Sequence, residues 1–174
     1  FDSEHDMFRN SFRKFLQEEA VPFHEQWEKD GQVSHEFWKK AGAQGYLCPT
    51  VPEAYGGSEA DFRYNAVVSE EVANFGLTGI GFNLHSDIAV PYLMAYGTEE
   101  QKHKYLPGCV SGDIVTAIAM TEPGSGSDLR GMKCKAVLDG DDWIINGEKH
   151  FISQASVSDY CVLFAATGEE KTDK

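Results

Sequence analysis

Apolar side chains recur every three or four positions over the first 110 residues of the chain, which is the period of an amphipathic helix. The pattern predicts a series of helices: a run ended by Pro22, one after Ser34, one over 61–75, one over 80–96, and one opened by the capping box Thr98–Gln101 and ended by Pro107-Gly108. The 80–96 segment is apolar on all sides, so we expect that helix to be buried.

Short apolar runs replace the helical period from about residue 113 onward. Ile114–Thr121 is too short for most helices and lies between Gly112 and Pro123, which predicts a strand. Lys133–Leu138 alternates weakly, and Tyr160–Ala165 is a further β run. The second part of the chain is therefore expected to be a set of strands.

The dipeptide Asn146-Gly147 lies between the runs 143–145 and 149–153 and is a strong signal for a two-residue hairpin. Helices followed by strands, without βαβ alternation, predict an α+β fold. We expect an all-α helical bundle over 1–112, followed over 113–174 by the first part of an antiparallel β-domain.

Length and charge narrow the class of protein. A chain of 174 residues can form one domain or about one and a half, and no window approaches the ~18 apolar residues of a membrane span. Its 28 Asp and Glu residues oppose 15 Lys and Arg, giving a net charge of -13. This balance argues against nonspecific nucleic-acid binding, which needs basic residues, and on its face also against polyanionic ligands.

Cysteine and histidine spacing gives no sign of a metal site. The cysteines are far apart without a CxxC pair, so we expect reduced, mostly buried thiols at Cys48, Cys109, Cys134 and Cys161. The histidines match no metal-ligand spacing, and no GxSxG elbow supports nucleophilic catalysis. The carboxylate pair Glu70-Glu71 is expected to be a solvated helix face.

Two segments could carry chemistry. Thr121–Asp128 is rich in Gly and Ser, and such a loop can hold a phosphate or a planar heterocycle through backbone N–H groups, although composition alone favours a plain connection. Phe151-Ile152-Ser153 could form an aromatic wall with a hydroxyl beside it, or simply an ordinary strand.

Taken together, these segments resemble the amino-terminal half of an acyl-CoA dehydrogenase, with the long-chain branch closest in look. The resemblance is carried in order by Trp38-Lys-Lys-Ala-Gly-Ala-Gln-Gly-Tyr46, Pro52-Glu-Ala-Tyr-Gly-Gly57, Gly97-Thr-Glu-Glu-Gln-Lys102, Ala119-Met-Thr-Glu-Pro-Gly-Ser-Gly-Ser-Asp128, Trp143-Ile-Ile-Asn-Gly-Glu-Lys149 and Phe151-Ile-Ser153. It implies that the chain stops inside the middle β-domain and lacks the carboxy-terminal helical bundle of the family.

The resemblance also implies a set of FAD contacts. Ile118, Met120 and Thr121 would border the flavin through backbone and hydroxyl contacts. Gly126 and Ser127 would lie near the FAD pyrophosphate. The segment of Phe151, Ile152 and Ser153 would place an aromatic ring against the isoalloxazine and a hydroxyl toward its N5 edge. Ser127 would also face the CoA substrate. Family members often have Trp and Thr at the positions of Phe151 and Ser153, and Asn-Gly at those of Gln154 and Ala155.

The family reaction converts an acyl-CoA thioester to the trans-2-enoyl-CoA, with a carboxylate base removing the α-proton and the β-hydride passing to the flavin. The resemblance places that base in the carboxy-terminal part, so no catalytic residue is assigned here and residues 1–174 alone are expected to be inactive. An acyl-CoA oxidase or flavin monooxygenase of the same fold, or a non-catalytic fragment, are the alternatives.

The implied partners are the acyl-CoA substrate, an electron-transfer flavoprotein, and further copies of the chain in a tetramer or dimer. Neither nucleic acid nor stable membrane insertion is expected. The implied location is the mitochondrial matrix in a eukaryote or the cytoplasm in a bacterium. FAD and CoA are both polyanions, so the net charge of -13 does not decide what a local site binds.

Overall fold

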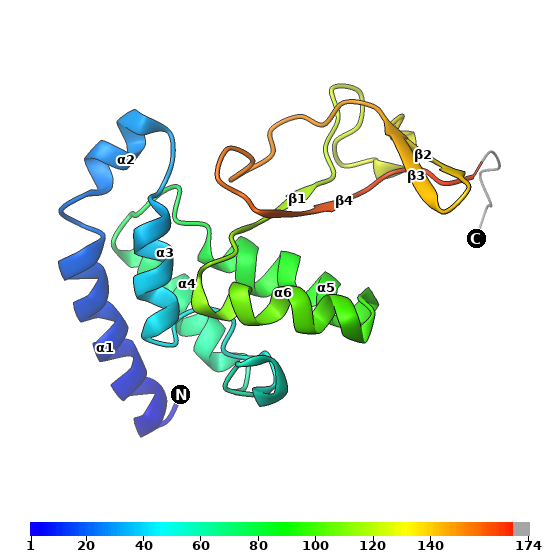
Figure 1. Ribbon diagram of the computed structural model, residues 1–174. Helices are drawn as coiled ribbons and strands as arrows, with labels where there is room; N and C mark the ends of the chain where they lie inside the picture. Colours follow the sequence, from blue (N-terminus) through cyan, green and yellow to red (C-terminus); the bar gives the residue numbers. More distant parts are fainter. Residues whose placement is uncertain (169–174) are drawn as a thin grey trace.

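The computed structural model describes residues 1–168. A bundle of helices is followed by two pairs of strands that extend from it (Figure 1). In chain order the elements are α1 (Ser3–Glu19), α2 (His24–Asp30), α3 (His35–Ala43), η1 (Glu53–Tyr55), α4 (Arg63–Asn74), η2 (Leu84–Ala89), α5 (Val90–Tyr96), α6 (Glu99–Ser111), β1 (Thr116–Ala119), η3 (Leu129–Gly131), β2 (Lys135–Asp139), β3 (Asp142–Asn146) and β4 (Tyr160–Leu163). The predicted order of helices before strands is confirmed.

Stacked aromatic rings form the centre of the helical core. Phe15 of α1 lies 5.4 Å from Phe37 of α3 between ring centroids, and Phe37 lies 5.3 Å from Phe82. Trp38 meets Phe82 edge-on at 4.8 Å. These apolar positions gave the helical period in the sequence, and their burial explains why the segments pack into one bundle.

Helix α6 begins as predicted but ends later. Thr98 Oγ1 accepts from the Gln101 backbone N–H at 3.2 Å, and Gln101 Oε1 accepts from the Thr98 N–H at 2.9 Å, which is a complete capping box. The prediction that Pro107-Gly108 ends the helix is wrong, because α6 continues to Ser111 with Pro107 inside it. Gly108 packs against the Ile114 side chain, where a Cβ would come within 2.6 Å of Ile114 Cδ1.

The segment predicted as a buried helix over 80–96 starts as a single π-helical turn, η2, and continues as α5. Val90 and Leu93 are buried, whereas Ile88 is 43% and Tyr96 81% exposed, so the expectation of burial on all sides is wrong in part. A π-turn widens the helix by one residue per turn and turns the following side chains to new directions.

His85 in η2 fastens that turn to α6 and to the first residue of β1. Its Nε2–H donates to the Cys109 carbonyl at 3.0 Å, which leaves Nδ1 as acceptor for the Thr116 hydroxyl at 2.9 Å. The ring is fully buried, and this burial lowers the pKa of His85 to about 4. The imidazole is therefore neutral at pH 7.

Stability is expected to fall as the pH drops from 6.5 to 4, with His85 contributing a loss of roughly 3 kcal/mol. The unfolded histidine gains its proton near pH 6.5 and the folded one near 4, so protons favour unfolding over this interval. An NMR titration of the imidazoles, with exposed His103 as the internal control, tests the cause. A titration of His85 near 6.5 would contradict the prediction.

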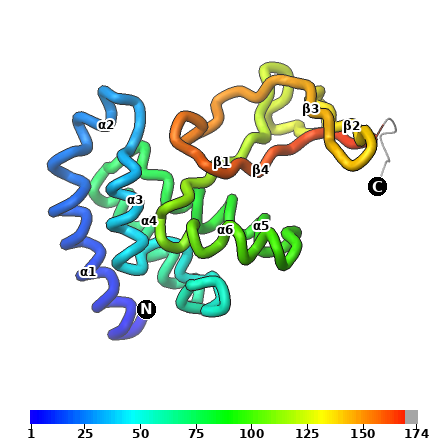
Figure 2. Tube along the Cα trace, viewed as in Figure 1, coloured from blue at the N-terminus to red at the C-terminus, as the bar shows by residue number. Residues whose placement is uncertain are grey.

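The strands form a parallel and an antiparallel pair. β1 pairs with β4 in parallel, with Ile118 opposite Val162, and β2 pairs with β3 in antiparallel register. The sheet is therefore not wholly antiparallel as expected. The long connection between β1 and β4 allows the parallel pairing, because the chain leaves the sheet, forms the β2–β3 hairpin and returns. Figure 2 shows this hairpin at the end of the molecule away from α1.

The hairpin turn lies at Gly140-Asp141 and not at Asn146-Gly147 as predicted, since Asp139 pairs with Asp142 across it. Gly147 is extended and lies against Cys134, where a Cβ would come within 2.5 Å of Cys134 Cα. Residues 148–153 form no strand and turn back toward the end of β1, where the His150 N–H donates to the Thr121 carbonyl. This return is what brings the two candidate segments together.

Four further expectations can be compared with residues 1–168. The thiols are free, and Cys48, Cys109 and Cys134 are buried while Cys161 is exposed. Glu71 is fully buried between α1 and α4, so its assignment to a solvated face is wrong. Within this part of the chain no helix has the length and hydropathy of a membrane span, and no group of three His, Cys, Asp or Glu side chains could hold a metal ion.

Candidate functional site

The predicted FAD contacts begin inside β1, ahead of the Thr121–Asp128 segment. The Ile118 side chain is 9% exposed and belongs to the core, so its part in a site is limited to the backbone. Met120 and Thr121 follow the strand and are half-buried. The Met120 carbonyl accepts from Lys149 Nζ at 3.0 Å and the Thr121 carbonyl from the His150 N–H at 2.8 Å. The Thr121 hydroxyl makes no hydrogen bond within the described residues.

The loop after Thr121 is tightly folded at its base and open at its tip. Glu122 and Ser125 exchange two backbone hydrogen bonds, at 2.9 and 3.1 Å, and the Ser125 hydroxyl donates to the Asp128 carbonyl at 2.7 Å. Gly126 and Ser127 are exposed, and a Cβ at Gly126 would meet no atom within 4 Å. The tip therefore presents backbone and a hydroxyl that a ligand can approach closely.

A buried ion pair joins this loop to the second candidate segment. Glu122 is 7% exposed and accepts from the backbone N–H groups of Lys133 at 2.5 Å and Cys134 at 2.9 Å, and from Lys149 Nζ at 2.9 Å. The Lys133 N–H and the Lys149 ammonium outweigh desolvation and lower the pKa of Glu122 to about 2. The carboxylate is thus charged at every physiological pH. Its hydrogen bonds connect the loop after β1 to residues 133–134 and to Lys149.

The sequence analysis did not identify Glu122 and Lys149 as positioning residues. Neither lies in a recognisable spacing relative to the other, because 26 residues and the whole β2–β3 hairpin separate them. Glu122 lies inside the Thr121–Asp128 segment, whereas Lys149 lies two residues before Phe151, outside the second segment, so local sequence did not pair the two residues.

The second segment presents an aromatic ring to solvent. Phe151 is 84% exposed and has a left-handed backbone with φ 57°, a conformation that non-glycine residues adopt rarely. Its ring stacks on His150 with centroids 4.1 Å apart, so one face is covered by the imidazole. Ile152 is half-buried, and exposed Ser153 makes no hydrogen bond within the described residues. An exposed ring and a free hydroxyl next to each other are suited to a planar heterocycle.

The predicted site residues therefore fall into two sets. The end of β1 and the start of the second segment are in direct contact through the Thr121–His150 hydrogen bond. Gly126 and Ser127 make no hydrogen bond to residues 149–153, and they lie on the open tip of the same loop. The fold brings the loop base to Lys149 and His150, directly before Phe151, and leaves the tip at Gly126 and Ser127 exposed.

Two protein-family models match this chain and show which family it belongs to. The model described as "Acyl-CoA dehydrogenase, N-terminal domain" matches residues 2–113, and that described as "Acyl-CoA dehydrogenase, middle domain" matches residues 117–174. The chain belongs to the acyl-CoA dehydrogenase family. The resemblance inferred from the sequence motifs is confirmed, and so is the fold class of a helical amino-terminal domain followed by the start of the middle domain.

Relatives cover nearly the whole chain. It is 51% identical over 170 residues to the mitochondrial long-chain specific acyl-CoA dehydrogenase of Rattus norvegicus, covering 98% of this chain and 40% of that protein. An acyl-CoA dehydrogenase structure from Geobacillus kaustophilus superposes with a TM-score of 0.91 at 51% identity, over 95% of this chain and 43% of the other. The chain thus spans less than half the length of these acyl-CoA dehydrogenases.

A third relative bears on the cofactor. The acyl-CoA dehydrogenase of Bacillus anthracis, solved in complex with FAD, has a TM-score of 0.88 and 35% identity over 96% of this chain and 29% of its own. The expectation that enzymes of this acyl-CoA dehydrogenase family use FAD is confirmed by that complex. The individual contact residues of this chain stay a prediction.

Proposed function

We propose that the protein catalyses FAD-dependent α,β-dehydrogenation of acyl-CoA thioesters to trans-2-enoyl-CoA, and that this chain supplies the amino-terminal part that binds FAD and substrate. The observation that carries the proposal is the contact between two loops through the Glu122–Lys149 and Thr121–His150 hydrogen bonds. One loop carries the exposed Phe151 ring, and the Thr121 and Ser153 hydroxyls have no hydrogen-bond partner among residues 1–168. We keep the domain boundary at 112/113 as part of this proposal.

The residues of this chain fit an FAD molecule. Phe151 offers one free ring face for stacking, and Ser153 and Thr121 offer hydroxyls that make no hydrogen bond within the described residues. The open tip at Gly126 and Ser127 offers backbone N–H groups and a hydroxyl to phosphate oxygens. Ile118, Met120 and Ile152 would border the ring system through backbone and apolar contacts. When bound, FAD supplies a two-electron acceptor.

The role of this chain in the reaction is positional. Its rigid loop base fixes Phe151 and Ser153 relative to β1, so that a substrate held at Ser127 meets a preorganised surface. The catalytic base of the proposed reaction is expected in the carboxy-terminal part of the full-length protein, and no residue of this chain is assigned that role. Acyl-CoA, an electron-transfer flavoprotein and further copies of the chain in a tetramer or dimer are the proposed partners.

The proposed location follows the relatives. Long-chain and isovaleryl-CoA dehydrogenases among them are mitochondrial, and others are bacterial. We place the protein in the mitochondrial matrix if its source is a eukaryote and in the cytoplasm if it is a bacterium.

Replacing Phe151 with alanine is expected to raise the dissociation constant for FAD of the full-length protein roughly three- to tenfold, which is the effect of losing one aromatic stacking contact. Flavin fluorescence during titration of the apoprotein measures it. Phe62, another exposed phenylalanine at 63%, lies outside the site and is the matched control for alanine replacement. Equal FAD affinity in wild type and the Phe151→Ala variant would remove Phe151 from the site.

The reaction itself is tested with the full-length holoprotein. Anaerobic addition of dodecanoyl-CoA should bleach the flavin absorbance and yield the trans-2-enoyl-CoA, and admission of air should restore the absorbance slowly. Fast reoxidation with stoichiometric hydrogen peroxide would instead identify an oxidase. Absence of bound flavin would support a non-catalytic protein and refute the proposal.

A further inference from the structure

The backbone on both sides of Ser153 has an unusual conformation. Phe151 has φ 57° and Gln154 has φ 64°, so two left-handed residues that are not glycine enclose Ile152 and Ser153. This conformation costs free energy because the Cβ atom approaches a carbonyl oxygen, and it persists only where the surrounding structure enforces it. The contacts that hold the two ends of this segment therefore determine where the Ser153 hydroxyl lies.

The two ends of the segment are held in different ways. The end before Phe151 is fixed near β1, because the His150 N–H donates to the Thr121 carbonyl at 2.8 Å. The other end runs into a compact turn over residues 154–158, in which the N–H groups of Val157 and Ser158 donate to the Gln154 carbonyl at 3.0 and 2.9 Å. Those two bonds fix the shape of the 154–158 turn, but they do not attach it to the rest of the protein.

His35 attaches the 154–158 turn to the helical domain. It is the first residue of α3, and its Nε2 lies 3.0 Å from the Val157 carbonyl oxygen, across 122 positions of sequence. A carbonyl oxygen only accepts, so Nε2–H is the donor. Among residues 1–168, no other hydrogen bond joins residues 151–158 to a helix. Helix α3 is itself fixed in the core, where Phe37 and Trp38 are buried.

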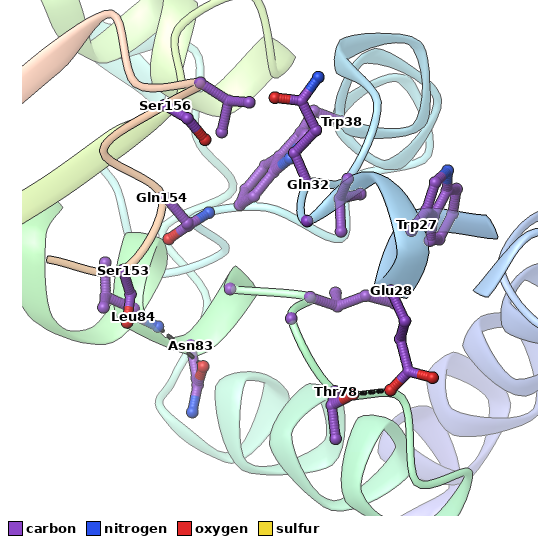
Figure 3. A pocket seen from close by; sticks show the side chains of 16 residues that line it. Trp27, Glu28, Gln32, Trp38, Thr78, Asn83, Leu84, Ser153, Gln154 and Ser156 are labelled. Atoms are coloured by element: carbon purple, nitrogen blue, oxygen red, sulfur yellow. Dashed lines mark hydrogen bonds between the residues drawn. The ribbon is translucent and has the colours of Figure 1, made fainter. Parts of the chain in front are cut away.

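The Gln154 side chain contributes packing to this attachment but no hydrogen bond. Its amide lies where a Cβ of Gly81 would be, and neither amide atom has a hydrogen-bond partner within the described residues. Figure 3 shows Gln154 and Ser153 at the wall of a cavity of about 550 Å³ that both residues line. A hydrogen bond has a preferred distance and direction, so the bond from His35 defines the position of the turn more sharply than this packing does.

We propose that His35 is a positioning residue for the flavin site, which holds the 154–158 turn against α3 and thereby fixes the Ser153 hydroxyl at the flavin edge. The proposal rests on the proposed function, because that function places Ser153 at this edge. The bond from His35 ties Ser153 to the helical domain, and the bond from His150 to Thr121 ties the same segment to the end of β1. A site held from two sides is preorganised for its ligand.

The test compares His35→Ala with His24→Ala in the full-length protein. His24 is the first residue of α2, and its Nε2 donates to the Thr78 carbonyl at 2.9 Å, which is the same kind of bond made within the helical domain. We expect His35→Ala to raise the dissociation constant for FAD about threefold, the effect of one hydrogen bond. It should also shift the reduction potential of the bound flavin in the same direction as Ser153→Ala does. His24→Ala should leave both quantities at their wild-type values.

A double-mutant cycle separates positioning from a general loss of stability. In the Ser153→Ala background, His35→Ala should change the dissociation constant for FAD by less than about 1.5-fold, because the hydroxyl that it positions is absent. His35→Gln keeps an N–H donor on a side chain of similar reach and should restore the wild-type affinity and potential. If His35→Ala does not fold, His35→Leu removes the donor while filling more of the space, and it takes the place of the alanine variant in the same cycle.

Wild-type FAD affinity and flavin potential in a folded His35→Ala variant would overturn the proposal for His35 and leave the proposed function intact. Equal effects of His35→Ala with and without the Ser153 hydroxyl would also overturn it, since His35 would then act on FAD binding by another route. Absence of bound FAD in the wild-type protein would refute the proposed function together with the role of His35, and it is measured before any variant is compared.

Discussion

Replacement of Glu71 by alanine is expected to lower the free energy of unfolding by about 3 kcal/mol, at the lower end of the range for breaking a buried ion pair. The carboxylate is fully buried and receives Arg9 Nη1 at 2.6 Å and Arg13 Nε at 2.5 Å. Burial would raise the pKa of Glu71, but the bonds from Arg13 and Arg9 outweigh it and the pKa is lowered.

The two guanidinium groups determine the size of this loss. Arg9 keeps a second partner in Glu70 at 2.7 Å, and the side chain of Arg13 is 47% exposed and can turn to water. Neither cation is left both buried and unpaired, which is why the expected loss lies at the lower end of that range. Loss of the bonds from Arg9 and Arg13 to Glu71 also removes an ionic contact between α1 and α4.

Urea unfolding of the wild type and of two variants measures the effect. Glu70→Ala is the matched control, because the neighbouring carboxylate is 53% exposed and its bond to Arg9 should contribute less than about 1 kcal/mol. Equal losses in Glu71→Ala and Glu70→Ala would show that burial of the ion pair does not matter here.

Replacing Lys149 with methionine is expected to raise the dissociation constant for FAD about tenfold or more, as fits the loss of a charge-assisted hydrogen bond that orders the site. Lys149 Nζ is bonded to both Glu122 and the Met120 carbonyl, and its side chain is only 9% exposed. Without it, Glu122 keeps its two backbone donors but the return of the chain toward β1 loses its main anchor.

The matched control is Lys133→Met. The Lys133 side chain is exposed, and this residue contributes its backbone N–H to Glu122, which the substitution leaves in place. Flavin content after purification and fluorescence titration of the apoprotein distinguish the two variants. Full FAD retention in a folded Lys149→Met variant would show that the ion pair does not position the site.

Local sequence was enough to select the two candidate segments, and their role in binding FAD stays a prediction. The Gly- and Ser-rich loop and the Phe151–Ser153 segment stand out by composition. In the structure the start of the first is hydrogen-bonded to His150, directly before the second, through the Thr121 carbonyl. What could not be predicted was the contact between them, because the buried Glu122–Lys149 pair connects residues far apart in sequence. A charged residue in a polar loop looks the same whether it faces water or closes an ion pair.

The sequence by itself determined the family, the order of helices before strands, and the helix starts that have side-chain caps, since periodicity, capping and motif spacing are local properties. Only the tertiary structure decided the parallel pairing of β1 with β4, the burial of Glu71, and the unpaired Gln154 amide against Gly81. Each of these depends on a segment distant in sequence: a partner strand, two guanidinium groups, or a glycine whose missing side chain leaves space for the amide. Local sequence patterns hold no information about such distant partners.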